Sequence, residues 1–365
     1  MRLTAPDEYF NHQVALPHAV VGNSDPNWRE RYWVSVQDIT RDDFMLSFGF
    51  GKYPNHDTVE AAAMLQAGTT QHNLNISREM GAESDQIAAG PLRAEVLEPL
   101  KRLRFTLDAR NKAGFAFDLE WTGAGPCLLE EKHFEVNRAR VTHDIIRYVQ
   151  LGRIAGEVTL PDGQRLELTH DTGVGERDHS WGIRPMAAGP GAPPTKSVDW
   201  QFLAFMPVQF PAFTMHLYLF ESDFGQPTHL SAIVALADGS QPKVLKVDHD
   251  LEWDVTAPAM TLKGGRMAVL LADGRRLDLT LRARAPRVYL SGGGYGHDHG
   301  QYKGAYSEEA STYDLADAAK LRGYAIGSSD HMIELDCDGE TGYGVMEYIV
   351  RRGHPYYAGR KAGPK

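Results

Sequence analysis

The residues best suited to chemistry lie in one short block, Gly175-Glu-Arg-Asp-His-Ser-Trp-Gly182. An imidazole exchanges protons near neutral pH, so His179 is a candidate acid–base catalyst, with Asp178 as its orienting partner and Trp181 as an apolar wall. Successive side chains of a strand point to opposite faces, so Asp178 and His179 face opposite ways unless a bulge intervenes, whereas Trp181 shares the face of His179. A structural interpretation is also open, in which Arg177 and Asp178 pair and Trp181 plugs a domain interface.

A second candidate site is the glycine-rich segment Gly292-Gly-Gly-Tyr-Gly-His-Asp-His-Gly-Gln-Tyr302. Its His297 and His299 form a His-x-His pair, which is a weak candidate for a metal chelate because zinc would need one or two further ligands. A solvated loop is the alternative that we favour. The sequence therefore predicts no metal, and we assign His299 and Tyr302 to ligand binding.

The third group lies near the end of the chain, in Thr341-Gly-Tyr-Gly-Val-Met-Glu-Tyr-Ile-Val-Arg351. In a strand, Tyr343 and Glu347 share one face with Val345 between them. A carboxyl group among apolar neighbours holds its proton to higher pH, so Glu347 is a candidate second acid and Tyr343 a candidate cavity wall. An ion pair between Glu347 and a nearby arginine is the alternative.

The elements that position these residues are predicted to be mostly β-strands. The 36 glycines and 20 prolines punctuate short segments rich in β-branched and aromatic residues. Two β-hairpins are predicted where an Asp-Gly pair separates alternating apolar segments, over 156–170 and 267–280. Further strands are predicted over 200–206, 213–221, 230–236, 244–255 and 343–351. Helices are predicted only over 58–67 and 315–321.

Two tandem β units of barrel or sandwich type, with little helix, are predicted from the organisation of the chain. Its 365 residues fit two domains better than one. The two hairpins share the pattern Asp-Gly-x-Arg-Leu-x-Leu-Thr, and each is followed by an Asp-His pair, the second being Asp298-His299. A duplication and chance convergence both explain this pattern. The predicted domains cover 1–186 and 197–365, with a Pro/Gly/Ala-rich linker over 187–196.

Composition and motifs exclude several classes of protein. Lys and Arg number 38 against 48 Asp and Glu, and the net charge of −10 argues against a general nucleic-acid binder. Two cysteines, Cys127 and Cys337, cannot build a disulfide framework. The sequence shows no run as apolar as a membrane span and no signal-peptide core, so we predict a cytoplasmic protein. Dinucleotide, Walker and nucleophile-elbow motifs are also missing from it.

Three motifs make the chain resemble a known superfamily: Tyr53-Pro54-Asn55 after an apolar segment, the 175–182 block, and the closing Gly342-Tyr-Gly-Val-Met-Glu-Tyr348. The chain resembles the lipocalin-like superfamily of carotenoid hydratases (hydroxyneurosporene synthases) and AttH-type proteins, in its two-domain bacterial branch. The resemblance implies two tandem lipocalin-like β-barrel domains with a ligand cleft between or within them, and adds Tyr53 to the ligand-binding candidates. It also implies acid–base chemistry on bulky apolar molecules without an organic cofactor.

The sequence therefore predicts a cofactor-independent lyase, of hydratase, dehydratase or carbon–carbon cleaving type, acting on a hydrophobic isoprenoid or a hydroxylated aromatic compound. His179 is the predicted proton shuttle, with Asp178 as its partner and Glu347 as a second acid. A non-catalytic binder or carrier of a lipid or aromatic ligand is the alternative, since it needs the same apolar cavity. Exposed strand edges are compatible with a homodimer.

Overall fold

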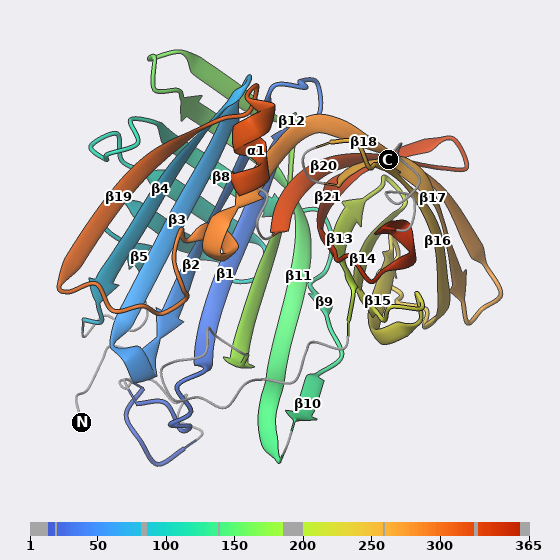
Figure 1. The fold of residues 1–365 in the computed structure, drawn as a ribbon, viewed down its shortest axis with the longest axis horizontal. Coiled ribbons are helices and arrows are strands. Elements are labelled where there is room, and N and C mark those ends of the chain that lie inside the picture. The colour runs from blue at the N-terminus through green and yellow to red at the C-terminus, as the bar shows by residue number, and fades with distance from the viewer. Residues whose placement is uncertain are drawn as a thin grey trace.

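The fold is antiparallel β-sheet almost throughout, arranged as two curled sheets that pack against each other (Figure 1). The computed structural model describes residues 14–18, 20–81, 86–137, 139–184, 200–257, 260–324 and 328–357. The prediction of a mostly β protein with two barrel-like units is confirmed. The predicted linker over 187–196 lies outside the described residues, and the domain limits stay predictions.

Sheet A is built mainly from the first half of the chain. Its strands are β1 (Trp28–Asp38), β2 (Phe44–Tyr53), β3 (Thr58–Ala67), β4 (Thr70–Glu79), β5 (Ile87–Ala89), β6 (Leu92–Glu98), β7 (Arg102–Leu107), β8 (Ala116–Gly123), β9 (Leu128–Leu129), β10 (His133–Asn137), β11 (Arg140–Thr159), β12 (Arg165–Ile183) and β19 (Tyr306–Asp314). Their spatial order is β19-β4-β3-β2-β1-β12-β11-β8-β7-β6-β5, with β9 and β10 beside β11. The sheet curls around one apolar interior to which both of its halves contribute.

Sheet B is built from the second half of the chain and is nearly closed. Its strands are β13 (Phe202–Gln209), β14 (Phe213–Glu221), β15 (Pro227–Leu236), β16 (Val244–Asp254), β17 (Thr261–Leu271), β18 (Arg276–Leu290), β20 (Ser328–Cys337) and β21 (Glu340–Val350). Their order is β15-β14-β13-β21-β20-β18-β17-β16, and a bridge between Ile233 and Lys243 ties one edge to the other. A second apolar interior lies inside this sheet.

Strand β19 crosses between the two halves of the chain. It follows β18 in sequence, yet it pairs along its whole length with β4 and forms an edge of sheet A (Figure 1). The two sheets are therefore joined by a strand as well as by side-chain packing.

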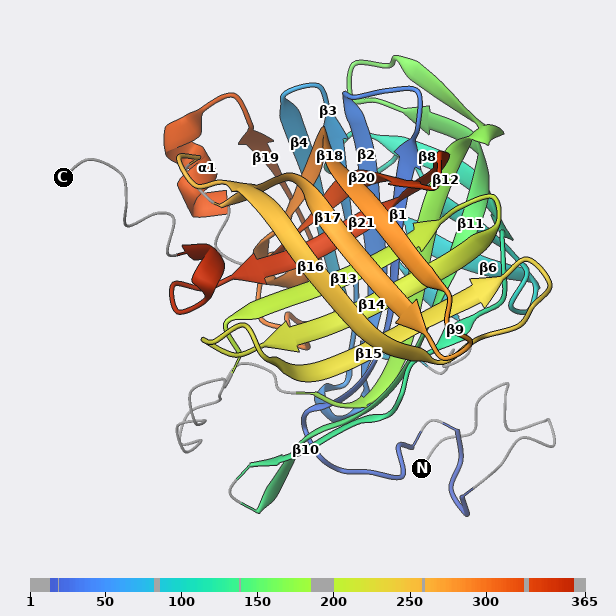
Figure 2. The same ribbon diagram turned by 90° about the vertical axis from the view of Figure 1, so that its right-hand side faces the viewer.

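Side-chain alternation gives sheet A two different faces. On β1, Tyr32 and Val34 point into the apolar interior, whereas Trp33 and Ser35 point toward sheet B. Figure 2 shows the strands of sheet B crossing those of sheet A. Apolar residues of both halves form the contact between the sheets: Trp33, Met45, Ala62, Met64, Val288, Leu290, Tyr295, Met332 and Val345.

The helix predicted over 58–67 is wrong, because this segment is strand β3. Its Ala, Glu, Met and Leu residues favour a helix in isolation, and that preference produced the prediction. In the fold, β3 is buried on both faces: Ala61 lies in the interior of sheet A and Ala62 lies against sheet B. Small side chains suit such a doubly covered strand, so tertiary packing overrides the local preference.

Both predicted hairpins are confirmed, with Gly163 and Gly274 at the positive φ angles of 88° and 90° that their turns require. The two Asp-His pairs do not occupy equivalent places, since Asp178-His179 lies within β12 and Asp298-His299 lies in the loop after the short helix η3 (Ser291–Gly294). The predicted helix over 315–321 is present as α1 (Ala318–Tyr324), and Asp317 accepts hydrogen bonds from its first amides. Within the described chain, no helix has the length and apolarity to cross a bilayer.

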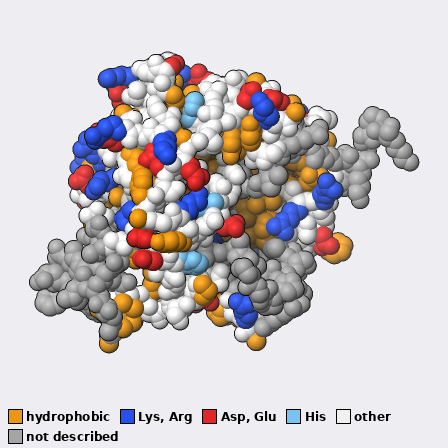
Figure 3. All heavy atoms as spheres, turned by 60° about the vertical axis from the view of Figure 1, so that its left-hand side comes forward, with side chains coloured by type: hydrophobic (Ala, Val, Ile, Leu, Met, Phe, Trp, Pro, Cys, Tyr) orange, Lys and Arg blue, Asp and Glu red, His pale blue; other side chains and the backbone are white. Residues whose placement is uncertain are grey.

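Charged side chains of both signs are interspersed on the face of the molecule shown in Figure 3. Exposed charges of opposite sign also pair across β7 and β8, as Arg102 does with Glu120 and Arg104 with Asp118. Mixed charges of this kind give a polyanion no continuous basic surface on that face.

Candidate active site

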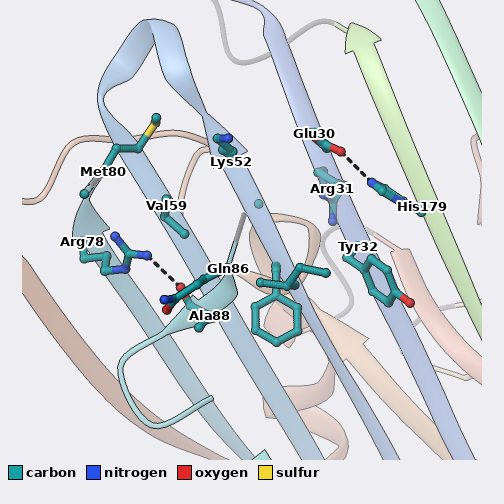
Figure 4. Close-up of a pocket in the computed structure, with 14 residues that line it drawn as sticks. Glu30, Arg31, Tyr32, Lys52, Val59, Arg78, Met80, Gln86, Ala88 and His179 are labelled. Carbon is teal, nitrogen blue, oxygen red and sulfur yellow. Dashed lines mark hydrogen bonds and ion pairs between the residues drawn. The ribbon is translucent and has the colours of Figure 1, made fainter. Parts of the chain in front are cut away.

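A cavity of about 240 Å³ opens into sheet A at the ends of β1, β2 and β3 (Figure 4). This volume is slightly below the roughly 300–1,000 Å³ of typical small-molecule pockets. Apolar side chains make most of its wall: Tyr32, Phe50, Val59, Met80, Ile87 and Ala88. Five charged or imidazole residues accompany them: Glu30, Arg31, Lys52, Arg78 and His179. The cavity therefore combines an apolar wall with a few polar groups, as ligand sites commonly do.

Strand pairing brings the polar groups of the cavity together. On β1, Glu30 and Tyr32 point inward, and the register pairs Tyr32 with His179 and Glu30 with Trp181 on β12. Because paired residues share a face, Glu30, Tyr32 and His179 converge although β1 and β12 are far apart in sequence.

The carboxylate partner of His179 is Glu30. His179 Nε2 lies 2.7 Å from Glu30 Oε1, and the two side chains are 23% and 38% exposed. Burial by itself would raise the pKa of Glu30, but the hydrogen bond and charge of His179 outweigh it and hold that pKa below its usual value. The pair is therefore arranged to share a proton within reach of the cavity.

A chain of hydrogen bonds fixes the imidazole of His179. Arg177 is buried and donates to Gln150 Oε1, to Tyr32 OH at 2.6 Å and to Tyr148 OH at 3.1 Å. Tyr148 OH lies 3.2 Å from His179 Nδ1, so with Arg177 as donor the hydroxyl can donate to Nδ1, which leaves the Nε2 proton directed at Glu30.

Trp181 lies where the alternation predicts. Its ring packs edge-on against that of His179 at 5.4 Å, on the same face of β12. Arg177 does not pair with Asp178, so the alternative of an Arg177–Asp178 clasp is wrong.

Asp178 and Glu347 lie on the other side of sheet A, in the contact between the sheets. Asp178 is paired with Trp33 on β1, and Glu347 is the cross-strand neighbour of Asp330. The structure therefore separates these two carboxylates from His179 by the thickness of the sheet. As predicted, neighbouring Asp178 and His179 face opposite ways.

The contact between the sheets contains buried acids that the sequence analysis did not single out. Asp330 Oδ2 accepts hydrogen bonds from Trp33 Nε1 at 3.0 Å and from Ser35 and Ser47 Oγ at 2.9 Å each. Burial, together with the nearby Glu347, raises the pKa of Asp330 to about 7. Burial also raises the pKa of Glu176, with Asp178 and Asp330 adding to the effect.

Replacing Asp330 by asparagine is expected to change how stability depends on pH. The pKa of Asp330 is about 7 in the folded protein against 3.8 ordinarily, so its stabilising proton is fully present below the ordinary value and is lost as the pH rises through about 7. Asp330→Asn keeps an oxygen acceptor and cannot ionise. The free energy of unfolding of Asp330→Asn should therefore increase relative to that of the wild type as the pH rises from about 5 to 8.

Urea titrations across this pH range measure that difference. Asp336→Asn is the matched control, because Asp336 is an exposed aspartate of the same strand. If the difference in free energy of unfolding between Asp330→Asn and the wild type stays constant with pH, the raised pKa of Asp330 is contradicted.

Like Trp181, the remaining predicted ligand-binding residues do not line the cavity. Tyr53 is fully buried, and its hydroxyl lies 3.0 Å from His299 Nδ1. Tyr302 is 55% exposed and donates to Glu79. Tyr343 is half-buried on β21, opposite Gln209. None of these four side chains lines the cavity that holds Glu30 and His179.

The His-x-His pair does not converge on a common point. His297 Nε2 lies 2.9 Å from Glu60 Oε1, whereas His299 contacts Tyr53. Within the described residues, the three side chains close enough to hold one metal ion are His133, Glu135 and His143. The rings of His133 and His143 stack in parallel, 4.6 Å apart, so their in-plane lone pairs cannot both point at one ion without rearrangement.

Two curled antiparallel sheets, each with an apolar interior and one with an acid–base pair in its cavity, define a protein of two barrel-like β units. The chain belongs to a family of unknown function, DUF8625, whose sequence profile matches residues 3–357. A search of curated proteins gave no match to it.

The crystal structure of kievitone hydratase from Nectria haematococca has a similar fold. The TM-score is 0.51 at 11% sequence identity, and the alignment covers 91% of this chain and 93% of that chain. At this identity the likeness shows the fold alone.

Proposed function

We propose that the protein is a cofactor-independent lyase that adds water to, or removes it from, a small hydrophobic substrate bound in the cavity of sheet A. The observation that carries the proposal is the Glu30–His179 pair, held at 2.7 Å and facing an apolar wall. The similarity of the fold to that of a protein described as a hydratase supports the same reaction class.

The pair can supply both proton transfers of such a reaction. For hydration, it gives a proton to one alkene carbon, a water oxygen bonds to the other carbon, and the proton released by that water returns to the pair. Glu30 is the more exposed member, so its carboxyl group is the one that the substrate meets. Reversal of these steps expels water from an alcohol, and neither direction consumes a cofactor.

The wall of the cavity suits the charged species that forms between these steps. Tyr32 and Phe50 present aromatic rings, which stabilise a nearby cation, and Val59 and Met80 exclude water. Lys52 and Arg78 also line the cavity and would attract the phenolic oxygen of a hydroxylated aromatic substrate. An isoprenoid alkene or a hydroxylated aromatic compound fits this lining.

Cytoplasmic location, bacterial origin and a homodimeric state stay predictions of the sequence.

The experiment is a turnover screen with the full chain. The panel contains kievitone, short isoprenoid alkenes and hydroxylated phenyl-alkenes, and mass spectrometry detects gain or loss of one water, with ¹⁸O-labelled water to prove its source. We expect label in the product of at least one compound, and loss of that product with Glu30→Gln. A panel compound that binds in the cavity with no turnover of any member would support the carrier alternative and contradict the lyase.

A further inference from the structure

Three arginine side chains gather on the face of sheet A that points toward sheet B. Arg29 and Arg31 are two residues apart on the same face of β1, and Arg31 is paired with Ser180 on β12. Arg184, directly after β12, donates to the Ser180 hydroxyl at 3.0 Å. The Arg29 guanidinium lies close enough to Arg31 and Arg184 for their charges to act on it.

This group of three arginines has no counter-ion among the residues that the structure describes. Among the described residues, no carboxylate oxygen lies within the 4.0 Å limit of an ion pair to any of them. The Nε atoms of Arg29, Arg31 and Arg184 and the Nη1 atom of Arg29 are buried and have no hydrogen-bond partner in the described part of the chain. Arg29 as a whole is only 4% exposed. Such unpaired buried donors are rare in folded proteins, because removing charged groups from water is costly.

A neighbouring arginine shows the contrast. Arg147 on β11 is paired with Ser180 from the opposite side, and its Nε lies 2.8 Å from the buried carboxylate of Glu130. Asp178 carries the only carboxylate described as acting on both Arg31 and Arg184, and it forms an ion pair with neither. One carboxylate at a distance cannot balance three cations.

The pKa values of Arg29 and Arg184 are lowered, whereas that of Arg31 is raised, because Tyr295 and other neighbours outweigh its burial. Burial and the neighbouring Arg31 and Arg147 lower the pKa of Arg184 to about 10. Burial and the neighbouring Arg184 also lower the pKa of Arg29 well below its usual value. An anion placed among the three groups would offset the like-charge repulsion that lowers the pKa values of Arg29 and Arg184.

The surroundings of the three arginines add a hydroxyl group and leave two of the arginines partly exposed. The Arg31 guanidinium lies over the rings of Tyr295 and Trp33 and interacts with the buried Tyr295 hydroxyl, and no described residue accepts a hydrogen bond from that hydroxyl. Arg31 and Arg184 are each only half-buried, so solvent reaches the group. Guanidinium forks and a phenolic hydroxyl match the oxygens of a carboxylate or phosphate.

We propose that the contact between the two sheets contains a binding site for a small oxyanion, held by Arg29, Arg31 and Arg184 with Tyr295 as a neutral donor. Arg31 also borders the Glu30–His179 cavity, but its side chain alternates along β1 with those of Glu30 and Tyr32, so the proposed site lies on the other face of the strand and does not depend on the proposed lyase activity. The ligand is an organic carboxylate or inorganic phosphate, which offer the same oxygen chemistry.

Isothermal titration of the full chain with inorganic phosphate and with benzoate, at constant ionic strength set by chloride, tests the proposal. We expect one of the two anions to bind at a single site, and at least about 10-fold weaker binding in Arg29→Met. Binding of phosphate alone or of benzoate alone would identify the ligand class. Arg102→Met, which removes an exposed arginine of β7, is the matched control and should bind as the wild type does.

Thermal unfolding provides a second, independent readout. Without added anion, Arg29→Met should unfold at the same temperature as the wild type or higher, because it removes an unpaired buried charge. Arg184→Met serves as a second variant, since this half-buried residue lies at the end of a strand. No binding of either anion to the wild type, or unchanged binding in both variants, would overturn the proposal.

Discussion

Replacing His179 by glutamine should lower kcat by about 10²–10⁴-fold while the protein keeps its fold. Glutamine can still hydrogen-bond to Glu30 and Tyr148, but it cannot exchange a proton. Turnover of the substrate found in the screen, measured per folded molecule, gives kcat, and thermal unfolding of the same sample gives its stability.

The control for this variant lies on the same strand. His170 is an exposed histidine of β12, so His170→Gln should leave kcat and stability unchanged. His179→Ala separates a catalytic role from a structural one. If His179 is merely structural, this variant should have a lower melting temperature and an unchanged kcat per folded molecule. A destabilised but fully active His179→Ala protein would end the catalytic proposal for this residue.

Glu130→Gln should lower the free energy of unfolding by about 3–5 kcal/mol, the range expected when one member of a buried ion pair is neutralised. Glu130 is 5% exposed, and its Oε1 lies 2.8 Å from both Arg147 Nε and His216 Nε2. The Arg147 guanidinium lies over the rings of Phe205 and Tyr218 in sheet B. Without the carboxylate, a buried arginine in the contact between the sheets has no counter-ion.

Acid should weaken the same contact. Burial by itself would raise the pKa of Glu130, but Arg147 and His216 lower it to about 2. The stabilisation is therefore full above the ordinary value of 4.5 and is lost as the pH falls toward 2, so Glu130→Gln should lose this part of the acid sensitivity.

Denaturant titrations at neutral and acidic pH measure both effects of Glu130→Gln. Glu120→Gln is the control, because the ion pair of Glu120 with Arg102 is exposed and is worth at most about 1 kcal/mol. Equal losses of stability in the two variants would contradict the role of Glu130.

Local patterns were sufficient to predict most strands of sheet B, the two hairpins and the faces of β12. Each depends on residues near one another in sequence: the Asp-Gly turns at Gly163 and Gly274, and the alternation that separates Asp178 from His179. The Ala-rich β3 was mispredicted because its state depends on what covers it from both sides.

The partner of His179 could not be predicted, because Glu30 is 149 positions away and depends on the pairing of β1 with β12. One signal was available in the sequence of β1, where Glu30 precedes Tyr32, Val34 and Val36 at alternating positions. An acid at the end of an otherwise apolar strand face marks a cavity lining. The convergence of Arg29, Arg31 and Arg184 depends in the same way on strand pairing.

The position of β19 sets an order of events during synthesis of the chain. Strands β1 to β12 leave the ribosome long before β19, so the edge of β4 stays without its neighbour until residue 314 has emerged. An open strand edge invites pairing with other chains, and closing so long a loop slows folding. The first barrel therefore completes its sheet only when most of the second has been made, and the two halves cannot be exchanged between proteins as separate modules.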